Sequence, residues 1–450
     1  MLFRSDFLRT SAIAGGALLV AACSPAAVAP PGQPAATQPA AAPPAAAQPT
    51  LAAKPAAAPA NLSGSLGYWH TFTSQSEMSG LEKVTKAFAD KYPNITVKSE
   101  NVPNADFMAK FTLAVQGGGK PETTMASNVR LPDMVAMGGL KDMTARVASW
   151  DQRQYLPDSR FADATVDGKI YGVPSFAFVD WMYYRADWFK EAGLQPPKTF
   201  DEFQAAAIKL TDPSKNRFGF GMRGAGGGEG LVIDVIRSFG SPIVDDKGQP
   251  AMDRQKATDA VRWYTELYTK YKAVPPSVTN DSFQQIMTGF TTGQTAMLWH
   301  HTGSLIDVST ALGADSGKFG TLPKPAGPGA HIAGVSYSYN SMSDPKNEDI
   351  AWAWLDHWAQ PDTQISFLES TGYFPSSTKV VDDPRLQKNP YYAAATETLK
   401  FGGPPPAFAG SSNWGLTVVL PAFQRVLLAE IKPEEAVDIM MKGLDKAVKG

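Results

Sequence analysis

The chain has 450 residues, and its 41 basic and 43 acidic side chains give a formal net charge of −2. This balance lacks the basic excess of nucleic-acid-binding proteins, so no nucleic-acid partner is expected. The length predicts two or three folding units, and the single cysteine, Cys23, excludes an intrachain disulfide.

The N-terminal segment has the pattern of an export signal. Arg4 and Arg9 lie in its first part, and residues 11–22 form an apolar stretch of twelve residues. A membrane-spanning helix needs about twenty residues, so this stretch is too short for a stable span. Ser5 stands where the twin-arginine motif has its second arginine, and both the general secretory route and the twin-arginine route stay open.

Residues 1–23 are therefore expected to be a lipoprotein signal peptide. The stretch from Val20 to Cys23 resembles the bacterial lipobox, in which the cysteine is lipidated, although an ordinary cleavage site beside a chance cysteine is the alternative. Residues 24–60 contain ten prolines and one charged residue, which favours an extended spacer over a core. The sequence predicts a lipid anchor at Cys23, a stalk, and a globular body from about Asn61. This places the body at the outer face of the bacterial cytoplasmic membrane or in the periplasm.

The body alternates between strand-like and helix-like segments. Leu81, Val84 and Phe88 recur at helical spacing, and apolar or β-branched runs predict strands. Strands are expected at 66–70, 95–97, 123–126, 218–220 and 296–299, and helices at 77–91, 104–116, 203–210, 257–271, 347–358 and 433–448. Thr199 and Glu202 have the spacing of a capping box before one helix. The alternation predicts an α/β fold with mostly parallel strands.

Six sequence blocks carry a resemblance to a known family. They are FADKYPNITV, DGKIYGVPSF, YYRADWFKEAGLQPPKTFDEF, FTTGQTAMLWH, GTLPKPAGPG and TGYFPSS. In this order they resemble the extracellular solute-binding proteins of bacterial ABC importers, in the sugar-binding group of the maltose-binding type. The resemblance runs from about Leu66 to the C-terminus.

The resemblance implies a two-lobed periplasmic-binding-protein-like fold, with each lobe a mostly parallel sheet flanked by helices. Crossovers between the lobes are expected near 176–180, 333–337 and 374–378. Lobe one would comprise 61–177 and 335–375, and lobe two 178–334 and 376–450. The family further implies a monomer that closes around a solute and docks on the permease subunits of an importer.

The stretch from Tyr171 to Phe189 is unusually aromatic, with eight rings in nineteen residues. In an extended strand, alternation places Phe176, Phe178 and Asp180 on one face. The other face, expected to be core, carries Ala177, Val179, Trp181 and Tyr183. Rings pack on the apolar faces of a pyranose, and a carboxylate accepts hydrogen bonds from hydroxyls. By the resemblance, Phe178 replaces a ligand-binding acid of the maltose-binding type. The alternative is a plain core strand with Asp180 paired to a lobe-two residue.

Further candidates lie at strand ends. Trp69 and His70 end the first predicted strand, where open α/β sheets bind ligands, although Trp69 can instead be core and His70 solvated. Asn128 and Arg130 follow the third strand, where the family often has polar ligand contacts. Arg130 suits a forked hydrogen bond, and its alternative is a surface salt bridge.

The resemblance adds other ligand-binding candidates. Tyr337 and Tyr373 lie beside the later crossovers, and Trp414 matches a late stacking tryptophan, although it can instead anchor a helix on lobe two. One histidine of the His300–His301 pair is expected to face the cleft, with His301 the candidate.

No metal or other cofactor is expected. Adjacent strand residues point to opposite faces, so the two neighbouring histidines do not predict a metal site. The glycine-rich segment from Gly221 to Gly230 fits neither the GxGxxG pattern nor the Gly-Lys-Ser/Thr pattern of phosphate-binding loops. It is expected to be a mobile loop between a strand and a helix.

The function favoured by the sequence is non-enzymatic capture of a carbohydrate, with an oligosaccharide as the favoured solute, for delivery to an ABC importer. Alternatives are a polyol or sugar-phosphate receptor, a secreted glycan-acting hydrolase, and a structural or adhesive lipoprotein. A hydrolase needs a positioned carboxylate pair or an activated nucleophile, and neither is evident in the sequence.

Overall fold

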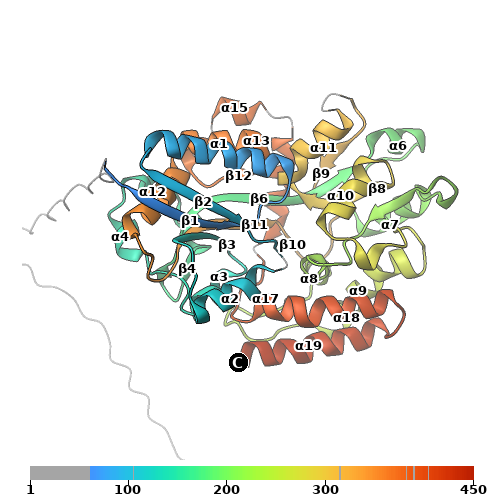
Figure 1. The fold of residues 1–450 in the computed structure, drawn as a ribbon. Helices are drawn as coiled ribbons and strands as arrows, with labels where there is room; N and C mark the ends of the chain where they lie inside the picture. The colour runs from blue at the N-terminus through green and yellow to red at the C-terminus, as the bar shows by residue number, and fades with distance from the viewer. Residues whose placement is uncertain are drawn as a thin grey trace, which may run out of the picture. The chain divides into compact units, whose positions relative to one another are not determined.

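The computed structural model describes residues 61–104, 106–313, 316–381, 383–388, 391–403 and 405–449 (Figure 1). The predicted signal peptide, Cys23 and the linker at 24–60 lie outside the described residues. Within the described part, no helix is both long enough and apolar enough to cross a membrane.

Lobe one is built on three parallel strands, β1 (Gly64–His70), β2 (Ile95–Asn101) and β3 (Thr123–Ser127), with β1 in the middle. On one face, α1 (Gln75–Lys91) and α12 (Glu348–Ala359) bury Phe88 edge-on against Trp354, with ring centroids 5.0 Å apart. On the other, α2 (Phe107–Gly117) packs Phe107 and Phe111 in a cluster with Trp69.

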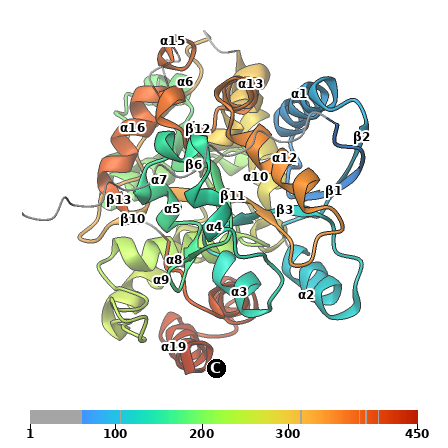
Figure 2. The same cartoon turned by 90° about the vertical axis from the view of Figure 1, so that its left-hand side faces the viewer.

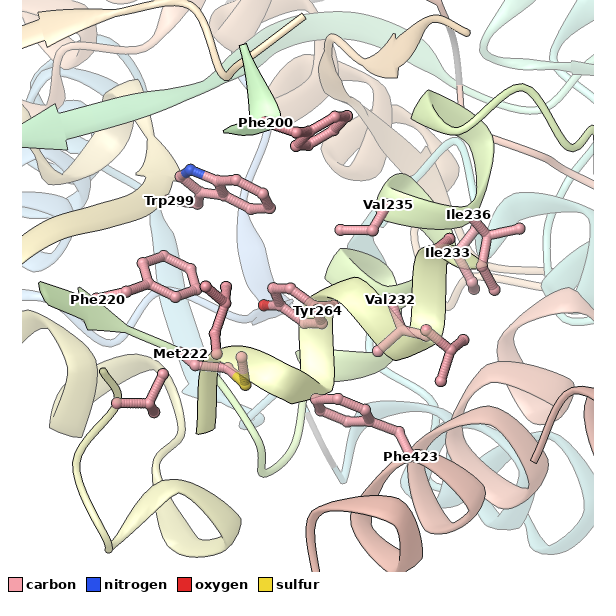
Figure 3. Packing of buried hydrophobic residues seen from close by; sticks show 14 of the residues in the cluster. Phe200, Phe220, Met222, Val232, Ile233, Val235, Ile236, Tyr264, Trp299 and Phe423 are labelled. Carbon is pink, nitrogen blue, oxygen red and sulfur yellow. The ribbon is translucent and has the colours of Figure 1, made fainter. Parts of the chain in front are cut away.

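Lobe two surrounds the parallel pair β7 (Phe218–Gly221) and β8 (Thr295–His301). The helices that contribute to it include α7 (Phe200–Lys209), α8 (Gly228–Ser238), α9 (Arg254–Thr269), α10 (Phe283–Thr291), α18 (Leu420–Leu427) and α19 (Pro433–Lys449). Its core stacks Trp299 of β8 on Tyr264 of α9, which in turn stacks on Phe423 of α18, with centroid separations of 5.9 and 5.6 Å (Figure 3).

A long strand joins the two halves of the sheet. β6 (Val173–Tyr184) pairs with β11 (Gly334–Ser341) over its first part and with β8 and β9 (Gly320–Leu322) over its second. The strand order is β2-β1-β3-β11-β6-β8-β7, and β12 (Phe374–Pro375) also pairs with β6. The three segments expected to cross between lobes therefore lie side by side at the centre (Figures 1 and 2).

The remaining elements cover these sheets. They are α3 (Leu131–Ala136), α4 (Thr144–Ala148), α5 (Asp158–Ala162), β4 (Thr165–Val166), β5 (Lys169–Ile170), α6 (Ala186–Glu191), α11 (Leu305–Leu312), β10 (His331–Ile332), α13 (Pro361–Thr371), α14 (Thr378–Val381), α15 (Pro384–Gln387), α16 (Tyr392–Phe401), β13 (Gly402–Gly403) and α17 (Ser411–Trp414). Val380 and Leu386 belong to the segment assigned by sequence to lobe two, yet they pack in the core that contains Phe88 and Trp354.

The α/β character predicted from the sequence is confirmed, and the predicted helices and strands form with shifted ends. The helix expected at 203–210 begins at Phe200, because Thr199 is its N-cap. The Thr199 hydroxyl accepts a hydrogen bond from the Glu202 N–H at 3.2 Å, and the Glu202 carboxylate accepts one from the Thr199 N–H. The predicted capping box is thus confirmed.

Replacing Thr199 by alanine is expected to lower the free energy of unfolding by about 1 kcal/mol, because the first turn of α7 loses an acceptor. Urea unfolding measures this loss. Thr199→Ser keeps the hydroxyl and is the matched control, so equal losses in both variants would contradict a capping role.

Candidate functional site

A cavity of about 570 Å³, the main cavity, lies where the two lobes meet the crossover strands. Its walls come from both lobes, from segments as far apart in sequence as Thr71 and Leu416. Its volume falls in the range of small-molecule sites. Eight of the eleven ligand-binding candidates from the sequence line it: Arg130, Phe176, Phe178, Asp180, His301, Tyr337, Tyr373 and Trp414.

Stacked rings from the three crossover strands form one wall. Phe176 of β6 lies parallel to Tyr373, just before β12, at a centroid separation of 4.9 Å. Phe178 stacks on His301 at 4.3 Å and approaches Tyr337 of β11 at 5.6 Å. Phe176 is almost fully buried whereas Phe178 is half-buried, so Phe178 offers the more accessible ring. This wall provides the apolar faces that sugar rings pack on.

Two arginines contribute cationic groups to the main cavity. Arg130, preceding α3 in lobe one, donates from Nη2 to the Asn104 carbonyl at 2.6 Å, and Arg223 in lobe two donates from Nε to the Gly226 carbonyl at 2.8 Å. Within the described chain, neither forms an ion pair with a carboxylate. Burial lowers the pKa of both guanidinium groups, and the nearby Glu229 carboxylate opposes the shift in each. Because no described carboxylate pairs with them, both arginines keep N–H donors available.

Asp180 brings a carboxylate into the same cavity. It lies where β6 changes partners, and its backbone N–H donates to the Ala333 carbonyl at 2.9 Å. No described residue hydrogen-bonds or ion-pairs with its side chain. Burial raises the pKa of Asp180 to about 6, although the positive charge of Lys324 opposes the shift. The main cavity thus holds, beside the donors of the arginines, an acceptor to which no described residue bonds.

Substituting Asp180 by asparagine is expected to change how stability depends on pH. The folded pKa of about 6 lies above the ordinary value of 3.8, so the folded chain holds an extra proton between these values. Stability therefore falls as pH rises through this window. Relative to the wild type, Asp180→Asn should become more stable from pH 4 to 6, by at most about 3 kcal/mol. Urea unfolding across this range measures it, and a pH-independent difference would contradict the raised pKa.

A buried ionic cluster adjoins Asp180. Asp234 of α8 pairs with Lys324 at 2.5 Å and with His331 Nδ1 at 3.1 Å, and it accepts the Ile332 N–H at 2.6 Å. Burial alone would raise the pKa of Asp234, but the Lys324 and His331 charges hold it well below its usual range. The cluster fixes β10, just before the crossover strand β11.

Hydrogen bonds connect segments on either side of the main cavity. The Tyr373 hydroxyl donates to Glu77, which belongs to the capping box of α1. On the opposite rim, Asp133 of α3 accepts the Gly410 N–H, and the Ser411 hydroxyl donates to the Val129 carbonyl at 3.2 Å. Figure 1 shows α3 beside α17 at this rim. The bonds at the α3 rim join lobe one to the segment that leads into α17.

Both His300 and His301 line the main cavity, whereas alternation predicted only one. The rings are 4.4 Å apart because β8 ends here, and the chain turns into a short helical segment. Burial lowers the pKa of His301 to about 3 and that of His300 well below its ordinary value. Both imidazoles are therefore neutral. Among the described residues, no group of three or more His, Cys, Asp or Glu side chains could hold a metal ion.

Three predicted candidates lie outside the main cavity. Trp69 is covered by α2, with Lys110 above its ring at 4.7 Å, and His70 is buried between Tyr68 and Phe72. Burial lowers the pKa of His70 to about 4. The prediction that Trp69 and His70 face the cleft is wrong because helices cover both faces of β1, and the cavity begins only at Thr71.

Asn128 is the third candidate outside the main cavity, whereas Trp414 lines the main cavity as a buried anchor. Asn128 lines a neighbouring cavity rather than the main one. Trp414 lines the main cavity, but it is only 1% exposed and its indole N–H donates to the Met440 carbonyl at 2.9 Å. Trp414 therefore acts mainly as an anchor on α19, which was the alternative considered from the sequence.

Sequence reasoning missed several cavity residues. Glu77 was detectable from the Ser74–Glu77 capping-box spacing, and Asp234 from its place in the apolar run LVIDVI. Arg223 and Glu229 lie in the glycine-rich segment and were not among the predicted ligand-binding residues. That loop does connect β7 to α8, as predicted, and Glu229 accepts the Gly227 N–H at 2.8 Å.

The main cavity combines ring faces, cationic donors and a carboxylate that has no partner among the described residues. Such a set can bind a polyhydroxylated molecule, whose C–H faces pack on rings while its hydroxyls donate and accept.

Comparisons with known proteins agree with this description. A binding protein of Brucella abortus is 27% identical over 326 residues, covering 71% of this chain and 77% of its own. The maltotriose-binding protein of Pyrococcus abyssi is 23% identical over 340 residues, covering 73% and 70%. The fold matches the GacH receptor of Streptomyces glaucescens, whose structures include a complex with acarbose, at a TM-score of 0.78 and 22% identity, covering 86% of this chain and 99% of that one.

The sequence profile of one family matches residues 73–365, which is more than half of the chain. The protein belongs to the bacterial extracellular solute-binding protein family.

Proposed function

We propose that the protein captures a carbohydrate between its two lobes by hinge closure and delivers it to the permease of an ABC importer. The observation that carries the proposal is the composition of the main cavity. The stacked rings of Phe178 and His301 share this cavity with the donors Arg130 and Arg223 and the acceptor Asp180. Relatives that bind maltotriose or acarbose support a carbohydrate as the solute.

Hinge closure is supported by the place of the crossovers under the main cavity. Phe178, Tyr337 and Tyr373 each belong to or adjoin a different crossover segment. A solute that contacts these rings and both arginines stabilises the closed arrangement over the open one. The proposed lobe boundaries are those given by the sequence, 61–177 with 335–375 and 178–334 with 376–450, except that the segment with Val380 and Leu386 packs on the lobe-one core.

We further propose a lipid anchor at Cys23, followed by the stalk at 24–60, so that a monomeric receptor stays near its permease. Two or more acyl chains give stable membrane attachment. The proposed activity is binding without turnover.

A thermal-shift panel on the full chain tests the proposal. Its probes are maltose, maltotriose, maltopentaose, mannitol and glucose 6-phosphate, with each reaction analysed afterwards for hydrolysis products. A solute at a hundred times its Kd adds about 2.7 kcal/mol of stability and raises the melting temperature. A rise with a saccharide and no products supports the proposal. Product formation would indicate a hydrolase, a response to mannitol alone a polyol receptor, and no shift a structural role.

A further inference from the structure

A second cavity of about 560 Å³, the side groove, lies beside the main cavity. One wall is the outer face of α3, a second comes from residues 162–167, and the third from residues 405–409. The groove therefore lies between a lobe-one helix and the segment that leads into α17, at the rim where Gly410 contacts Asp133.

The side groove adjoins the main cavity. Pro405 and Phe408 line both spaces, so the segment carrying them is the partition. This partition is short and held at both ends. Gly403 pairs with Ile332 in a two-stranded sheet before it, and Gly410 donates its N–H to Asp133 after it. The Phe408 ring is half-buried, 6.2 Å from the Trp414 ring.

Like the main cavity, the groove combines apolar surface with oxygen acceptors. Asn128, whose backbone N–H donates to the Ser336 carbonyl at 3.0 Å, has a buried side-chain oxygen with no partner in the described chain. Asp167 adds an exposed carboxylate, whereas Pro132 and Phe408 add apolar surface. Apolar faces with a few free acceptors suit a sugar residue, whose hydroxyls donate to Asn128 and Asp167.

We propose that the solute is a linear oligosaccharide that extends from the main cavity past Phe408, so that its terminal sugar residues occupy the side groove. The inference rests on the proposed function and adds the length of the solute. A disaccharide would be held by the ring wall and the arginines alone. Longer chains would also cover Ala136 at the end of α3, which lines only the side groove.

Cysteine reactivity tests this placement, because Cys23 is the only native cysteine. The full chain carrying Cys23→Ala and Ala136→Cys is treated with a thiol-reactive dye in the presence of maltose, maltotriose or maltopentaose, and of cellobiose or cellopentaose. Ala145→Cys in the same background is the matched control, since Ala145 is also an exposed helical alanine of lobe one but lines neither cavity. Thermal shift of each variant reports binding in the same samples.

At ten times its Kd a saccharide leaves roughly one-eleventh of the protein free, so full coverage slows modification about tenfold. With a pentasaccharide, dye modification of Ala136→Cys is expected to slow about tenfold. The matching disaccharide should slow it little, and no saccharide should slow modification of Ala145→Cys. A thermal shift with no length-dependent protection would overturn the side groove and leave carbohydrate capture standing. Absence of any thermal shift would overturn both.

A filling substitution gives a second readout. Ala136→Trp is expected to lower the ratio of the pentasaccharide affinity to the disaccharide affinity by about tenfold. Titration with the two sugars measures this ratio. An unchanged affinity ratio would contradict occupation of the groove.

Discussion

Asp234→Ala is expected to lower the free energy of unfolding by about 3 to 5 kcal/mol, one of the two largest effects on stability that we predict. The Lys324 and Asp234 side chains are each only 1% exposed, and the alanine leaves the ammonium and His331 buried without their carboxylate. The Ile332 N–H also loses its acceptor. Because Ile332 precedes the crossover strand β11, the same change is expected to loosen the hinge.

Urea unfolding at neutral pH measures this effect, with Lys324→Met as the partner variant. The double variant Asp234→Leu/Lys324→Met removes both charges, and replacing a buried pair by apolar residues is often close to neutral. It should therefore recover much of the stability that Asp234→Ala loses. Additive losses in the double variant, or a loss under 1 kcal/mol for Asp234→Ala, would contradict a coupled pair.

Phe178→Ala is expected to weaken carbohydrate binding by about tenfold to a hundredfold, or roughly 1.4 to 2.8 kcal/mol. The half-buried ring of Phe178 is backed by His301 at 4.3 Å and presents its remaining surface to the main cavity. Its removal deletes a face on which a sugar packs, while little of the core is lost. Calorimetric titration with the best saccharide of the panel measures the affinity, and urea unfolding measures the stability.

Phe176→Ala is the matched control, two residues away on the same face of β6. Phe176 is 2% exposed and packs between Tyr373 and Tyr337, at 4.9 and 5.3 Å. It should cost about 3 to 5 kcal/mol of stability as a core truncation. Unchanged affinity of Phe178→Ala with a large stability loss would make Phe178 an ordinary core residue as well.

Much of the fold is predictable because its signals are local. The Thr199–Glu202 spacing predicted where α7 begins, and strand alternation predicted that Val179, Trp181 and Tyr183 pack in the core, as they do. The family resemblance predicted three crossover segments, and these segments pair side by side in the sheet. The structure adds that β6 changes partners at Asp180.

The site was less predictable because covering layers are not local. Trp69 and His70 end a strand as expected, yet helices cover both of its faces. Phe176 shares the cleft-facing side of β6 with Phe178, but Phe367 of α13 packs on its ring at 5.3 Å and completes its burial. In the same way, nothing near Asp133 in the sequence indicates that it accepts the N–H of Gly410, 277 residues later.

The central claim is that a carbohydrate draws the lobes together, and an inter-lobe distance tests it most directly. Spin labels on Ala145→Cys of α4 and Lys209→Cys of α7, in the Cys23→Ala full chain, report one position on each lobe. The best saccharide of the panel should shift the distance distribution towards a single shorter value, and Arg130→Ala should weaken this response. A saccharide that binds tightly while the distance distribution stays unchanged would contradict capture by closure.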